Sequence, residues 1–140
     1  MTTNAKPRKV TSVLLWTGQI VLGLLFVWAA APKLLGDPLM VQSFETIGFG
    51  QWFRVLTGVC ELAGGIGLLI PPLAGLAALG LAGVMAGATL TNLFLLPGQE
   101  PIAITTVVLG AIFLLIARGR HASTRALLTR LRRQPEPRTA

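Results

Sequence analysis

Charged, sulfur-containing and metal-binding side chains are scarce in this chain of 140 residues. Only 12% of the residues are charged, which is about half the share usual for a soluble domain. Cys60 is the single cysteine, so the chain can form no internal disulfide and has no Cys-x-x-Cys pair for thiol redox chemistry. The single histidine, His121, has no cysteine or second histidine near it in the sequence, and we therefore expect no metal site.

Apolar residues dominate instead, at 53% of the chain and a mean hydropathy of +0.71. This composition is typical of a membrane protein, and the length fits one domain. Ten of the twelve lysines and arginines lie before Val10 or after Ala117, so the net charge of +7 is not spread over a folded surface. Basic clusters beside apolar segments usually set membrane topology. We therefore expect a lipid bilayer as the partner and no nucleic acid.

Four apolar segments are long enough to cross a bilayer, at about residues 11–35, 52–70, 73–93 and 101–117. They predict an all-α membrane protein with a four-helix transmembrane domain over residues 10–117, preceded by a disordered basic segment at residues 1–9. A secretory signal peptide is the alternative for the first segment, because basic residues precede it and three alanines stand near its end. Its uncharged run of 22 residues exceeds the typical signal core of about 7–15 residues, which favours an uncleaved helix.

One stripe of the first segment recurs at steps of three and four residues and predicts the face that packs in the bundle. The stripe consists of Trp16, Gln19, Gly23, Phe26, Ala30 and Lys33. Gln19 is polar within the span, and we favour an interhelical hydrogen bond for it over a role in a ligand site. Lys33 lies near the predicted helix end at Gly36. It either reaches the lipid headgroups or serves as the counter-charge for a buried carboxylate.

Two further segments have sequence patterns that predict local structure. Asp37-Pro38 reads as a helix N-cap followed by proline, and residues 38–47 predict a short amphipathic helix in the membrane interface, between the first and second spans. The third span contains Gly83-x-x-x-Gly87 and three alanines at the same spacing, at positions 78, 82 and 86. Small residues at this spacing predict tight helix packing within the bundle.

Glu61 is the only charged residue among the 45 from Val55 to Gln99. A carboxylate at membrane depth costs several kcal/mol unless it is protonated, paired or hydrated, so we place the candidate functional site around it. Glu61 shares a helix face with small residues, which predicts that it faces the bundle and not lipid. Arg54 lies two turns away, about 10 Å along the axis, so no direct contact between the two side chains is expected.

The candidate ligand-binding set consists of the polar residues that the spans could bring together. They are Glu61, Lys33, Arg54, Gln19 and Asn92.

The tail over residues 118–140 has leucines at 127, 128 and 131 among its arginines. It predicts a basic amphipathic helix on an anionic leaflet, followed by disorder over residues 134–140. Four spans place both termini on the same side, and the positive-inside rule predicts a cytoplasmic location for both. We therefore expect a multi-pass protein of the cell (plasma) membrane.

The chain resembles the DoxX-like membrane proteins between about Val13 and Ala117. The resemblance rests on Ala30-Ala-Pro-Lys33-Leu, on Arg54…Gly58-Val-Cys-Glu61-Leu-Ala-Gly-Gly and on the small residues of the third span. It implies a four-helix bundle linked to redox systems, such as a subunit of thiosulfate:quinone oxidoreductase, although other members have no assigned activity. It also implies that Lys33, Arg54 and Glu61 occupy the family's characteristic polar positions. Many members carry a histidine near the end of the third span, where this chain reads Thr89-Leu-Thr-Asn92.

Three functions follow as alternatives. The first is an accessory membrane subunit of a quinone-linked redox system, with no independent catalytic activity and with an oxidoreductase subunit as its partner. The sequence has no motif for haem, flavin or an iron–sulfur cluster, so quinone is the cofactor that this alternative requires. The second is a membrane scaffold or assembly factor, and the third is a small-solute carrier, for which a homo-oligomer would be needed.

Overall fold

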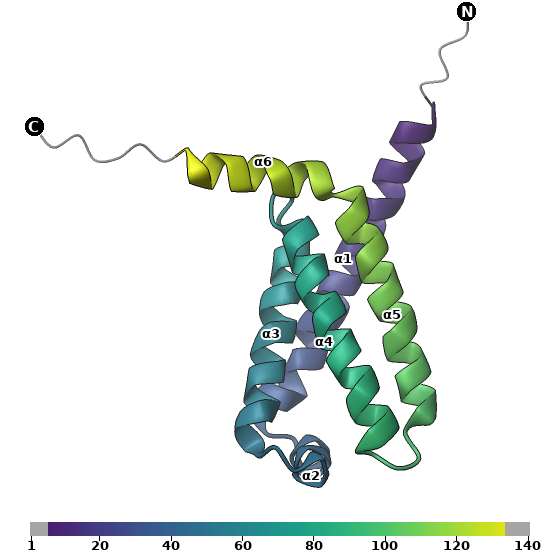
Figure 1. Ribbon diagram of the computed structural model, residues 1–140, viewed down its shortest axis with the longest axis vertical. Helices are drawn as coiled ribbons and strands as arrows, with labels where there is room; N and C mark the ends of the chain where they lie inside the picture. Colours follow the sequence, from purple (N-terminus) through teal and green to yellow (C-terminus); the bar gives the residue numbers. More distant parts are fainter. Residues whose placement is uncertain (1–5, 134–140) are drawn as a thin grey trace, which may run out of the picture.

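The structure is a computed structural model that describes residues 6–133, and in this range the chain forms six α-helices (Figure 1). The helices are α1 (Lys6–Leu35), α2 (Pro38–Ile47), α3 (Gln51–Leu69), α4 (Ala74–Phe94), α5 (Glu100–Gly119) and α6 (His121–Arg132). Four of them, α1, α3, α4 and α5, are long and apolar enough to cross a membrane. The predicted fold class is confirmed, including the short helix between the first and second spans.

The four long helices run side by side, and the two short helices lie at opposite ends of the bundle (Figure 1). We call these the α2 end and the α6 end. The long helices pack as two close pairs, α1 with α3 and α4 with α5, and α3 joins the pairs by packing on α4. Toward the α6 end α3 and α4 converge, and toward the α2 end they diverge (Figure 1). The predicted cytoplasmic location of both termini stays a prediction.

The first helix begins earlier than expected. Residues 6–9 were predicted to be disordered, and this prediction is wrong because α1 starts at Lys6. Lysine and arginine favour helices, and a proline in the first turn removes no intrahelical hydrogen bond. Residues 1–5, and the predicted disorder over 134–140, lie outside the described residues. At its other end α1 stops at Leu35, where Gly36 adopts a left-handed conformation with φ of 77°.

The predicted stripe of α1 does face the bundle, because Gln19, Phe26 and Ala30 are buried. Gly23 brings α1 directly against Gly65 of α3. A Cβ atom added to Gly65 would lie 2.8 Å from the carbonyl oxygen of Gly23, and one added to Gly23 would lie 2.9 Å from the carbonyl oxygen of Gly65. The two backbones therefore approach as closely as only glycine allows.

The core between the helix pairs is aromatic and aliphatic. The rings of Phe26 and Phe113 meet edge to face with their centroids 5.0 Å apart, and Leu68, Leu81 and Met85 are buried around them. This cluster joins α1, α3, α4 and α5 toward the α6 end, which leaves the α2 end less tightly filled.

The short helix α2 forms as its sequence predicts. The side chain of Asp37 accepts a hydrogen bond of 2.9 Å from the backbone N–H of Leu39, which is the N-cap interaction. Phe44 and Ile47 are buried, and the ring of Phe44 lies 5.8 Å from that of Phe53 on α3. Leu39, which is also apolar, is 68% exposed. Thus α2 covers the diverging ends of the long helices with only part of its apolar surface.

The predicted packing through small residues of α4 is confirmed at Ala78 and Ala82, which are buried in the core, but it is wrong at the glycines. A Cβ atom added to Gly83 or Gly87 would meet no atom within 4 Å, and Ala86 is exposed. The helix packs through the face that carries the two buried alanines together with Leu81 and Met85, and the glycines lie on another face. The glycines therefore leave open space beside α4.

The tail forms the predicted helix α6, which crosses the bundle end at a steep angle to the long helices (Figure 1). Leu127 is half-buried, whereas Leu128 and Leu131 are exposed together with the arginines of the helix. This pattern is that of a basic amphipathic helix, and its contact with an anionic leaflet stays a prediction.

Candidate functional site

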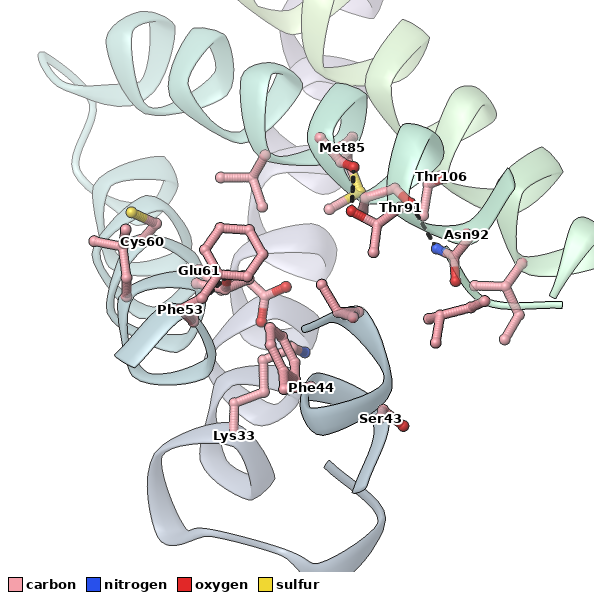
Figure 2. A pocket seen from close by; sticks show the side chains of 18 of the residues that line it. Lys33, Ser43, Phe44, Phe53, Cys60, Glu61, Met85, Thr91, Asn92 and Thr106 are labelled. Carbon is pink, nitrogen blue, oxygen red and sulfur yellow. Dashed lines mark hydrogen bonds and ion pairs between the residues drawn. The ribbon is translucent and has the colours of Figure 1, made fainter. Parts of the chain in front are cut away.

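A cavity of about 700 Å³ lies where the two helix pairs diverge, bounded by α2, α3, α4 and the first turns of α5 (Figure 2). Most of its lining is apolar or glycine. Its polar lining side chains are Lys33, Ser43, Thr57, Glu61, Thr91, Asn92, Gln99 and Thr106. A cavity of this size with few polar groups is typical of a small-molecule site.

Glu61 stands on the α3 wall of this cavity with only 5% of its surface exposed. Its Oε2 atom lies 2.9 Å from Nζ of Lys33, a residue in the last turn of α1. Lys33 is therefore the counter-charge of Glu61, the second of the two roles considered for it. Because the last turn of α1 ends over α3, a lysine there can reach a carboxylate deep in the neighbouring helix.

The ion pair leaves hydrogen-bonding capacity unused. The contact between Lys33 and Glu61 has the distance of an ion pair without the angles of a hydrogen bond, and within residues 6–133 Oε2 of Glu61 accepts no hydrogen bond. Lys33 donates weakly to the carbonyl oxygen of Ala29, at 3.4 Å. Buried polar atoms usually have hydrogen-bond partners, and a carboxylate has room to accept several, so a carboxylate with only Lys33 beside it on a cavity wall suits a ligand that donates a hydrogen bond.

Arg54 supports this pair without touching Glu61. Its guanidinium donates to the backbone carbonyl of Lys33, and its Nε donates to Oε1 of Gln51 at 2.6 Å. Carbonyls in the last turn of a helix lack intrahelical partners, so Arg54 caps the end of α1. The expectation of no direct contact between Arg54 and Glu61 agrees with this geometry. Arg54 acts on the site by fixing the backbone from which Lys33 extends.

Gln19 lies toward the α6 end of the bundle, where it contacts α3 seven residues beyond Glu61. Its Nε2 donates to the carbonyl oxygen of Leu68 at 3.0 Å, and its Oε1 accepts from Nε of Arg120 at 2.7 Å. The guanidinium of Arg120 also lies over the ring of Trp16, 5.4 Å from its centroid. Gln19 is fully buried and links α1, α3 and the junction of α5 with α6. This is the interhelical role favoured for it, and the structure does not bring it into the cavity.

Asn92 lies on the cavity wall near the α2 end, five residues beyond Gly87 on α4 (Figure 2). Its Nδ2 donates to the carbonyl oxygen of Ala88 at 2.8 Å, within its own helix. On the same wall, Thr106 of α5 shares a hydrogen bond of 2.7 Å with Thr89 of α4. The structure therefore brings Lys33, Glu61 and Asn92 to one cavity, with Arg54 behind them.

Two elements of this arrangement were not predicted from the sequence. Arg120 was assigned only to the basic tail, although a glutamine buried in a span needs a partner and the first charged residues after the last span are the ones in reach. Cys60 and Thr106 were not expected to line the cavity, and no pattern within a single helix indicates that they do.

The model of the DoxX-like family matches residues 17–121, which is most of the chain and includes all residues that line the cavity. The chain belongs to the DoxX-like family. Comparisons with curated proteins and with solved structures each gave no match. Together with its four span-capable helices, the family makes this DoxX-like protein a multi-pass integral membrane protein in a lipid bilayer.

Proposed function

We propose that this DoxX-like protein binds a quinone headgroup in the cavity beside Glu61 and Lys33, as an accessory membrane subunit of a quinone-linked redox system. The observation that carries this proposal is the ion pair, buried in the wall of an apolar cavity. Glu61 follows Gln51 by ten residues and precedes Leu69 by eight, so it lies about 15 Å from one end of α3 and about 12 Å from the other. That depth corresponds to the middle of the hydrocarbon region.

A buried ion pair is a poor device for holding helices together. The cost of removing both charges from water can exceed their attraction, and apolar side chains of similar volume often stabilise as well or better. In this bundle Gly23, Gly65 and the aromatic core already supply the packing between the spans. The pair is thus better explained by a ligand than by a scaffold role.

The chemistry of the pair matches both redox forms of a quinone. A quinone carbonyl accepts a hydrogen bond, which the ammonium of Lys33 can donate, whereas a quinol hydroxyl donates one, which the carboxylate of Glu61 can accept. The side chains of Glu61 and Lys33 are not oxidised or reduced. The oxidoreductase partner therefore supplies or accepts the electrons of the quinone. In this proposal the DoxX-like chain binds the headgroup, and its side chains form the hydrogen bonds to the quinone or quinol oxygens.

The test is native mass spectrometry of the protein purified from its own membrane in mild detergent. We expect a retained quinone, together with an oxidoreductase subunit, in the wild type and in Glu45→Gln, which changes an exposed glutamate of α2. We expect the quinone to be lost from Glu61→Gln, because the amide has no negative charge to form an ion pair with Lys33 and cannot take up a proton near neutral pH. A wild type that carries only phospholipid would turn the assignment toward a scaffold or a carrier.

A further inference from the structure

The cavity is open on one side, between α3 and α4. Six of its lining residues are exposed: Gly87 and Ile102 lie nearer the α2 end, and the other four, Leu56 and Cys60 on α3 and Gly80 and Gly83 on α4, lie along these two helices. A Cβ atom added to either glycine would meet no atom within 4 Å. We call this set of four residues the lateral opening.

The lateral opening ends sharply toward the α6 end. There a Cβ atom added to Gly64 would lie 2.5 Å from the side chain of Leu81, and one added to Gly67 would lie 2.8 Å from Cβ of Ala77. The two helices are thus in contact from one turn beyond Cys60 onward. Figure 1 shows the same course, since α3 and α4 meet near α6 and separate toward α2.

The lateral opening lies at the middle of the membrane-spanning helices. Cys60 follows Gln51 by nine residues and Gly83 follows Ala74 by nine, which places both about 14 Å along helices of 19 and 21 residues. A hydrocarbon layer is about 30 Å thick, so this opening meets acyl chains and not water. The polar lining residues Ser43, Asn92 and Gln99 lie away from it, toward the α2 end.

We propose that the lateral opening is a portal through which the hydrocarbon tail of an amphiphilic ligand passes between the cavity and the bilayer. The ligand class is a long-chain lipid with a compact polar head. The identity of the head at Glu61 and Lys33 rests on the proposed function, whereas the passage of the tail rests on the exposed residues. The tail occupies the cleft that the α4 glycines leave, where Val84 and Met85 continue the apolar wall inward. This assigns a use to glycines that no neighbouring helix contacts.

The experiment compares two benzoquinones with the same substituted ring, one with a decyl tail and one without a tail. Their binding is measured by titration calorimetry on the full chain in nanodiscs. Gly83→Leu should weaken binding of the decyl compound by at least about tenfold and leave the tailless compound unchanged, because the new side chain fills the opening and not the polar site.

Gly18→Leu is the matched control, since Gly18 is another helical glycine whose added Cβ would meet no atom within 4 Å. It should leave binding of both compounds unchanged. Cys60→Phe narrows the same opening from α3 and should repeat the effect of Gly83→Leu if that variant folds poorly. Equal affinities of Gly83→Leu and Gly18→Leu for the decyl compound, or an equal loss for both compounds, would overturn the portal.

The design separates the portal from the headgroup assignment. Failure of Gly83→Leu to affect the decyl compound, while Glu61→Gln abolishes binding, overturns the portal and leaves the proposed function standing. The reverse result overturns the role of Glu61 and supports the portal. If the wild type binds neither compound, both proposals are overturned.

Discussion

Lys33→Met is expected to lower the free energy of unfolding by about 3–5 kcal/mol, because it leaves the Glu61 carboxylate buried without its partner. The double variant Lys33→Met/Glu61→Met removes both charges and fills the space with apolar groups. It should recover most of the lost stability, since an apolar pair carries no desolvation cost. Unfolding of the detergent-solubilised protein, followed by circular dichroism against denaturant, measures both values.

Lys9→Met provides the control, because it makes the same substitution at an exposed lysine of the same helix. Its effect should stay within about 0.5 kcal/mol. Strictly additive effects of the two single substitutions at Lys33 and Glu61 would mean that the side chains do not interact, which contradicts the ion pair. A stable double variant that no longer retains quinone would separate the functional role of the pair from any structural one.

Gly65→Ala is expected to destabilise the protein by about 1–3 kcal/mol, because its methyl group would press on the backbone of α1 at Gly23. A backbone oxygen cannot rotate away as a side chain can, so the two helices must separate. Gly18→Ala should act in the opposite direction and stabilise by up to about 1 kcal/mol, since alanine favours a helix and its Cβ meets nothing. The same unfolding measurement applies, and effects of equal sign and size would contradict the close α1–α3 contact.

Hydropathy and charge were sufficient to predict the fold class of this chain. An uncharged run has few stable alternatives in a bilayer, because every backbone polar group must be satisfied within the segment. The cap at Asp37 and the stop at Gly36 could likewise be predicted, since both depend on local backbone geometry. The helical start at Lys6 was missed because helix propensity extends beyond the membrane-spanning residues.

The partners of the polar residues were harder to predict. Glu61 could be recognised as buried from its isolation in the sequence, yet its pairing with Lys33 depends on how far α1 extends over α3. Gln19 and Asn92 were both included in the candidate site, although an interhelical hydrogen bond was favoured for Gln19, and only the packing of the helices shows that its partners lie toward the α6 end. Spacing within one helix predicts a shared face but not which helix meets that face.

The glycines show the same limit. Gly65 and Gly83 both belong to small-residue patterns, but Gly65 contacts a helix backbone and Gly83 faces open space. A small-residue pattern indicates that two helix backbones can approach closely at that position. Whether they do depends on how the neighbouring helices are arranged. The cavity could not be predicted from the sequence, because it forms where α3 and α4 diverge, and this arrangement does not follow from the pattern of either helix.

The most direct test of the cavity as a quinone site is photolabelling with an azidoquinone in native membranes, followed by peptide mass spectrometry. We predict labels on α3 and α4 residues that line the cavity, above all Cys60 and Met85, and their loss in Glu61→Gln but not in Glu45→Gln. Labels confined to lipid-facing residues such as Val21 and Leu115, at the same level in every variant, would contradict the site.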